Sequence, residues 1–132
     1  MTPALPDILI GQAVGLATPL PPEAGGDYFA GRIGLLAMLA SLAAQEAERG
    51  IAARVWENAA IGALLAKAGE GEAEASSDLS WRALDAVNAH LRRRLIAVHE
   101  AAEARGDAAL QVEILNLYVE MAAARRLNLS TG

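Results

Sequence analysis

Residues 33–44 read IGLLAMLASLAA and contain no charged residue. The helix that this stretch predicts carries apolar side chains all round, and such a helix is buried on all sides. A membrane-spanning helix needs about 20 apolar residues, whereas a run of about 10 to 14 is more typical of a buried core helix. We therefore expect a core helix, covered by the other helices of the chain or by a second copy of it.

Small residues recur along the same helix at spacings of three and four. They are Ala30, Gly34, Ala37, Ser41 and Ala44. Residues at these spacings share one stripe of a helix surface. Because small side chains let a second backbone come close, the stripe predicts tight packing against another helix.

The composition predicts one all-α domain. Of the 132 residues, 54% are hydrophobic and 20% are charged, which argues against disorder. Alanine and leucine dominate and aromatic residues make up 4%, so helices are favoured over strands. The net charge of −5 provides no basic surface, and we expect no nucleic-acid partner. The chain has no cysteine, which excludes disulfides and cysteine metal sites.

The apolar stretch near the N-terminus, residues 8–16, lacks the features of a secretion signal. No lysine or arginine precedes it, whereas a signal peptide begins with a basic region. We accordingly expect a cytoplasmic protein without a membrane segment.

Aspartate and glycine residues punctuate the rest of the chain as helix ends. The predicted N-caps are Asp27, Asp78 and Asp107. The predicted C-terminal glycines, each following a basic residue within two positions, are Gly50, Gly69 and Gly106. These signals predict helices over 27–49, 51–68, 78–105 and 107–126. A single kinked helix over 27–68 is the alternative, because no capping residue follows Gly50.

These helices predict an antiparallel four-helix bundle over residues 27–126. Short connections at Gly50 and Gly106 would make two helical hairpins, and short connections give antiparallel neighbours. All five prolines lie in residues 1–26, which predicts an extended arm that packs on the bundle. Residues 127–132 form a C-terminal tail.

Apolar residues at spacings of three and four mark the core-facing seam of each later helix. In 51–68 the seam is Ile51, Val55, Asn58, Gly62 and Leu65. In 78–105 it is Trp81, Leu84, Asn88, Leu91, Leu95, Val98 and Ala102, and in 107–126 it is Leu110, Ile114, Leu117, Met121 and Ala124.

Two asparagines interrupt these seams, and antiparallel packing places them at one level. Counted from the turn at Gly50, Ser41 reaches about the same level. We predict a buried polar layer of Ser41, Asn58 and Asn88. Its amides either bond each other and fix helix register, as a core asparagine does in coiled coils, or hold a small ligand. We favour the first interpretation, because buried polar groups are usually satisfied by one another.

A second polar group is predicted at the opposite end of the bundle. His99 and Glu113 lie seven residues on either side of Gly106, with Glu103 one turn from His99. Histidine and carboxylates are ligands for Zn, Fe or Mn, although solvated ion pairs are the favoured interpretation. A ferritin-like di-iron centre is disfavoured, because no glutamate stands three residues before either histidine.

We expect a non-enzymatic interaction or scaffold protein that forms a homo-oligomer, most simply a dimer. This expectation rests on the helix containing residues 33–44, which has more apolar surface than a monomeric four-helix bundle needs to bury. The sequence has no nucleophile elbow, phosphate-binding loop or dinucleotide motif, and we expect no cofactor. The alternative is a binding module or enzyme that holds a small ligand at Ser41, Asn58 and Asn88, or a metal at His99, Glu103 and Glu113.

Overall fold

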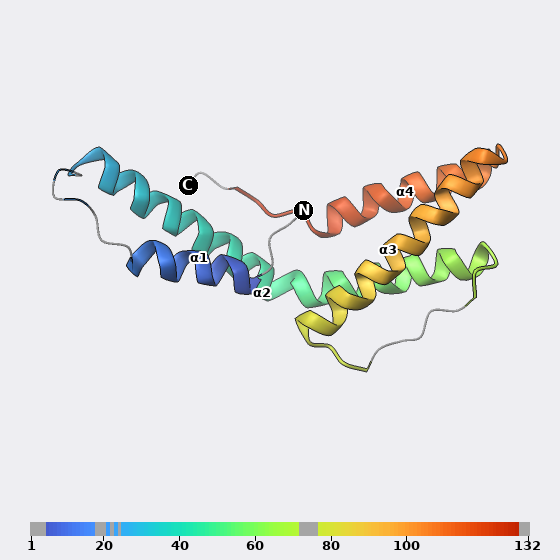
Figure 1. The fold of residues 1–132 in the computed structure, drawn as a ribbon, viewed down its shortest axis with the longest axis horizontal. Helices are drawn as coiled ribbons and strands as arrows, with labels where there is room; N and C mark the ends of the chain where they lie inside the picture. Colours follow the sequence, from blue (N-terminus) through green and yellow to red (C-terminus); the bar gives the residue numbers. More distant parts are fainter. Residues whose placement is uncertain (1–4, 18–20, 22, 24, 72–76, 130–132) are drawn as a thin grey trace. The chain divides into compact units, whose positions relative to one another are not determined.

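The computed structural model describes residues 5–17, 21, 23, 25–71 and 77–129. Over these residues the chain is all-α, as predicted (Figure 1). The helices are α1 (Leu5–Ala17), α2 (Asp27–Lys67), α3 (Trp81–Ala104) and α4 (Ala108–Ala124). They divide into two compact units: unit 1 holds Met1–Arg49 and Leu127–Gly132, and unit 2 holds Gly50–Arg126. This division differs from the predicted single bundle over 27–126.

The predicted turn at Gly50 is not formed, and α2 is continuous from Asp27 to Lys67. A glycine inside a helix costs only about 1 kcal/mol relative to alanine. A break would leave the first amides of a new helix without a capping side chain. The side chain of Arg54 also donates from Nη1 to the Gly50 carbonyl at 3.1 Å. The continuous helix, the alternative expected from the missing cap, is the one observed.

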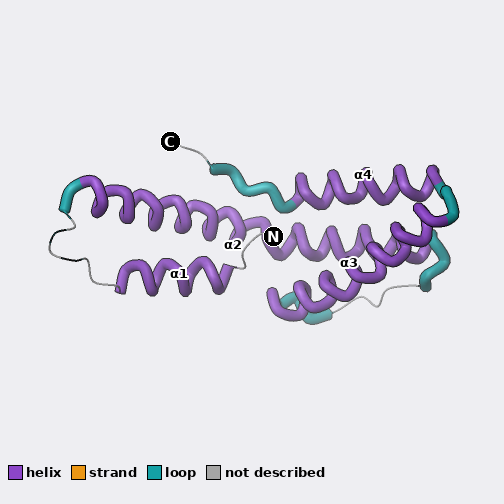
Figure 2. Tube along the Cα trace, turned by 45° about the horizontal axis from the view of Figure 1, so that its top comes forward, coloured by secondary structure: helices purple, strands orange, loops and turns teal. Residues whose placement is uncertain are grey.

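In unit 1 a helix stands where an extended arm was predicted. α1 begins at Leu5, so Pro6 lies in its first turn, where the missing N–H has no helical partner to lose. Gln12 Nε2 donates to the Leu36 carbonyl at 3.1 Å, and Arg32 Nη2 donates to the Gly15 carbonyl. These contacts hold α1 antiparallel along the first part of α2 (Figure 2).

Unit 2 is a three-helix bundle in which α3 runs parallel to the second part of α2 (Figure 1). Arg54 contacts Asp85 and Glu57 contacts Asn88, so positions rise together along the two helices. The antiparallel pairing predicted here is therefore wrong. The connection from Lys67 to Trp81 contains 13 residues, which can extend about 40 Å and so reach back along the roughly 27 Å helix segment. α4 then returns antiparallel to α3 after the tight turn at Gly106.

The core of unit 2 confirms the seam predicted for α3 and the middle of the seam predicted for α4, where Ile114, Leu117 and Met121 are buried while Leu110 and Ala124 are partly exposed. Every predicted α3 position except the partly exposed Trp81 is buried. The main core cluster consists of Ile61, Leu65, Leu91, Leu95, Val98, Ile114, Leu117 and Met121. The seam predicted for α2 is only partly right, because Val55 is 41% exposed while the charged neighbours Arg54 and Glu57 are buried.

The helix ends of unit 2 largely follow the predicted signals. Asp107 caps α4, accepting from Leu110 N at 3.2 Å. α3 is capped by Ser80 rather than by Asp78, whose carboxylate instead accepts from Ser80 N at 2.8 Å. Gly69 and Gly106 take left-handed φ values of 85° and 69° beyond their helices, a conformation that suits glycine.

Candidate functional site

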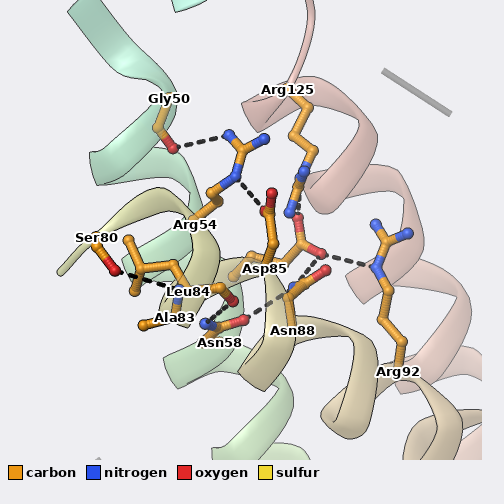
Figure 3. Close-up of polar contacts among 11 residues, drawn as sticks. Gly50, Arg54, Asn58, Ser80, Ala83, Leu84, Asp85, Asn88, Arg92 and Arg125 are labelled. Atoms are coloured by element: carbon orange, nitrogen blue, oxygen red, sulfur yellow. Dashed lines mark hydrogen bonds and ion pairs between the residues drawn. The ribbon is translucent and has the colours of Figure 1, made fainter. Parts of the chain in front are cut away.

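A buried carboxylate joins the three helices at one end of unit 2. The side chain of Glu57 on α2 is 0% exposed. Its Oε1 accepts from Asn88 Nδ2 at 2.8 Å and from Arg92 Nε at 2.9 Å, both on α3. Its Oε2 accepts from Nε of Arg125, the C-cap residue of α4, at 2.6 Å (Figure 3). One side chain thus receives three hydrogen bonds from two other helices.

These partners hold Glu57 in its charged form. Burial by itself raises the pKa of the carboxyl group, because it removes water from the charge. The hydrogen bonds from Asn88 and Arg125, together with the positive charges of Arg125 and Arg92, act in the opposite direction and prevail. The pKa of Glu57 therefore lies below its usual value, and the group is an anion at neutral pH.

A second buried pair lies beside the first. Arg54 on α2 is 2% exposed, and its Nε donates to Asp85 Oδ1 on α3 at 2.5 Å. Its guanidinium also lies over the Trp81 ring, 4.0 Å from the ring centroid, which is a cation–π geometry. Figure 3 shows this pair and the Glu57 group side by side between the same helices. We call the two together the ion cluster, comprising Arg54, Glu57, Asp85, Asn88, Arg92 and Arg125.

The two asparagines predicted to lie at one level do meet. Asn88 Nδ2 donates to Asn58 Oδ1 at 2.9 Å, and Asn58 Nδ2 donates to the Leu84 carbonyl at 3.2 Å. The contact arises from parallel helices, not from the antiparallel pair that motivated the prediction. The amides bond each other and their neighbours, which is the geometry of the register-fixing interpretation.

Ser41 is not part of this layer. It lies on α2 about five turns before Asn58, since the helix does not turn at Gly50. Its side chain is exposed in unit 1. It lines an open hollow of about 430 Å³ together with Gly34, Ala37, Met38, Leu42, Asn128 and Leu129.

The ion cluster is arranged for holding helices together rather than for proton transfer. Both carboxylate oxygens of Glu57 already accept hydrogen bonds from cations, so the group is a poor general base. Asp85 is likewise engaged by Arg54. Among the described residues, one buried side-chain nitrogen, Arg125 Nη2, has no hydrogen-bond partner.

The proposed metal ligands are only partly brought together. His99 Nε2 lies 3.7 Å from Glu103 Oε1, and its Nδ1 lies 3.4 Å from the Tyr118 hydroxyl. Glu113 instead binds Lys67, with both carboxylate oxygens 2.7 Å from Nζ. Among the described residues, no three histidine or carboxylate side chains are grouped to hold a metal ion. A metal at His99, Glu103 and Glu113 stays a prediction.

A second candidate surface is apolar and lies in unit 1. Phe29, Ile33, Leu35 and Met38 on α2 are 41–52% exposed, so α1 does not cover this helix on all sides. Among the residues that the structure describes, the expected burial of this helix by other helices of the chain is thus not observed. By length and composition, α2 is also the one described helix that could span a membrane, and 6% of its apolar window is buried. This apolar surface of α2 is therefore a second candidate interaction site.

None of the charged residues of the ion cluster was predicted as a site residue. The available signal was the spacing of Arg54, Glu57, Ile61 and Leu65, which places two charges in line with two core residues on one helix face. A search for core-facing rows that accepts only apolar residues does not find this pattern.

Comparisons with known proteins add no relative: no family model, no curated protein and no solved structure matches the chain.

Proposed function

We propose that this chain is a non-enzymatic, cytoplasmic interaction protein that works by associating with further copies of itself, most simply as a dimer through unit 1. One observation carries the proposal: the large apolar residues Ile33, Leu35 and Met38, which lie on more than one side of α2, are left 41–52% exposed by their described neighbours. Extensive exposed apolar surface on a folded chain marks an interaction site.

The make-up of unit 1 favours a second copy as the covering surface. Its described part contains one short helix and one long helix segment, and two helices cannot enclose a core. Two such hairpins related by a two-fold axis would supply the four helices of an ordinary bundle. The exposed small residues Gly34, Ala37, Ser41 and Ala44 leave room for a close approach, and a Cβ added at Gly34 would meet open space.

A lipid bilayer is the weaker candidate for the same face. The uncharged run of residues 33–44 is shorter than the roughly 20 residues that a bilayer requires. Arg32 immediately precedes it and already bonds the backbone of α1 through the Gly15 carbonyl. A binding or enzymatic role at the asparagines receives no support from Asn58 and Asn88, whose amides are engaged with each other.

Sedimentation equilibrium of the full chain at micromolar concentration tests the proposal. We expect a dimer or larger assembly that Leu35→Lys weakens at least tenfold, since a half-exposed leucine is replaced by a charge that must be desolvated. Ala47→Lys is the matched control, because Ala47 is exposed on the same helix outside the run. A strictly monomeric chain, or flotation with neutral phosphatidylcholine vesicles that Leu35→Lys abolishes, would overturn it.

A further inference from the structure

Helix α4 of unit 2 presents an apolar face that no described part of the chain covers. Three large apolar residues on it are strongly exposed: Val112 at 56%, Leu115 at 52% and Val119 at 70%. The exposed Ala108 and Ala122 extend the row by one step at each end. We call Ala108, Val112, Leu115, Val119 and Ala122 the α4 seam; it is a different face of the helix from the core-facing seam that contains Ile114, Leu117 and Met121.

The α4 seam has the spacing of a helix-pairing surface. Its steps are four, three, four and three residues, the spacing of the a and d positions of a coiled coil. At about 100° per residue, the seam lies about 150° around the helix from the core-facing row of Leu110, Ile114, Leu117 and Met121. α4 therefore has two nearly opposite apolar stripes, and the bundle of unit 2 uses one of them.

Charged residues of α4 stay off the seam. The helix carries two, Glu113 and Glu120, and Glu113 is engaged by Lys67 of α2. The same 100° step places Glu120 about 120° from the middle of the seam. A second helix could thus lie along the seam without burying a charge.

The order of side chains along the seam is symmetric about Leu115. Read in either direction it is Ala, Val, Leu, Val, Ala, because Ala108 and Ala122 each lie seven residues from the centre. An antiparallel copy of α4 crossing at Leu115 places Val112 opposite Val119 of that copy and each end alanine opposite the other. A two-fold interface requires a surface that is complementary to itself in this way.

We infer that the α4 seam is a two-fold interface at which a second copy of this chain packs its own α4 antiparallel, with Leu115 on the symmetry axis. The inference concerns unit 2 and goes beyond the association proposed through unit 1, because either interface could form without the other.

Disulfide trapping in the full chain tests the pairing, and the natural absence of cysteine makes each introduced thiol unique. With a rise of about 1.5 Å per residue, Val112 and Val119 of the other copy differ by about 1.5 Å along the axis, whereas two copies of Val112 differ by about 9 Å. A disulfide needs Cα atoms within about 7 Å. Leu115→Cys should link to itself, and Val112→Cys should link to Val119→Cys in a mixture but poorly to itself. Glu120→Cys, off the seam, is the control.

Three results would overturn the inference. The first is the absence of a disulfide-linked Leu115→Cys dimer. The second is a yield of Val112→Cys dimer as high as that of the mixture with Val119→Cys, which would indicate parallel helices. The third is a Glu120→Cys dimer yield equal to that of the seam variants, which would indicate random collision. Leu115→Glu provides a second readout and should weaken the association of the full chain at least tenfold. If Leu35→Lys disperses the oligomer and Leu115→Glu does not, the α4 inference fails and the unit 1 proposal stands. If Leu115→Glu disperses the oligomer and Leu35→Lys does not, the unit 1 proposal fails and the α4 inference stands.

Discussion

Replacing Glu57 by glutamine tests whether the ion cluster holds unit 2 together. The substitution keeps the shape of the side chain but removes its charge and turns one acceptor into a donor. If the amide nitrogen faces Arg125, a bond at 2.6 Å becomes a contact between two donors, and a largely buried guanidinium is left without its anion.

The expected loss can be worked from the three hydrogen bonds. A hydrogen bond to a charged group contributes about 1.5–3 kcal/mol, and a charged acceptor binds about twice as strongly as a neutral one. The Arg125 bond is lost and the Asn88 bond is weakened, while Arg92, whose side chain is 46% exposed, regains water. The sum is about 3–4 kcal/mol, in line with the roughly 3–5 kcal/mol found when one partner of a buried ion pair is removed.

Urea unfolding followed by tryptophan fluorescence measures this loss, because Trp56 and Trp81 both lie in unit 2. With a slope of about 1–3 kcal/mol per molar urea, the midpoint should fall by at least about 1 M. Glu113→Gln makes the same change in an exposed pair with Lys67 and should cost at most about 1 kcal/mol. A loss for Glu57→Gln no larger than that of Glu113→Gln would refute the reasoning.

The same cluster makes two further predictions. Because the pKa of Glu57 is lowered by folding, its contribution to stability is complete above the ordinary glutamate pKa of about 4.3 and is lost as the pH falls through the lower folded value. The difference in unfolding free energy between the natural chain and Glu57→Gln should therefore shrink between pH 7 and pH 3, and a constant difference would contradict this. A register-setting asparagine alone would tolerate leucine, but Asn88 donates to both Glu57 and Asn58. We expect Asn88→Leu to cost about 1–3 kcal/mol in the same urea assay, and an unchanged or raised midpoint would show that these bonds are dispensable.

The sequence was sufficient for the helices whose pattern is strongly periodic. In α3 and α4 the apolar rows run unbroken for several turns, so a packing face could be assigned from spacing alone, and the buried residues confirm it. The glycine at 106 and the aspartate at 107 fixed the end of one helix and the start of the next for the same local reason. Local signals decide such features because their physical cause lies within a few residues.

Features that depend on distant residues could not be predicted in this way. A connection of 13 residues permits either direction for α3, so the orientation of α2 and α3 was not determined by sequence. Glu57 is buried because arginines 35 and 68 positions away in the chain neutralise it. A charged residue on a helix is exposed by default, and the alignment of Glu57 with Ile61 and Leu65 on α2 does not show which distant cations neutralise it. The contact between Asn58 and Asn88 was predicted by counting residues along an antiparallel pair of helices. In the structure the two asparagines meet although α2 and α3 are parallel.

The ion cluster holds the helices of unit 2 together, whereas the α4 seam leaves apolar surface of the same unit exposed. Its three helices are tied at one end by charge pairs and along their length by an apolar core, so the unit needs no partner to fix its register. α4 nevertheless keeps a second apolar stripe, and α2 keeps an exposed apolar face in unit 1. If both faces pair two-fold with further copies, one chain carries two distinct isologous interfaces. Such an assembly either closes, as in a tetramer with three perpendicular axes, or continues as an open chain. Variants that block one interface should then leave dimers, and only blocking both should give a monomer.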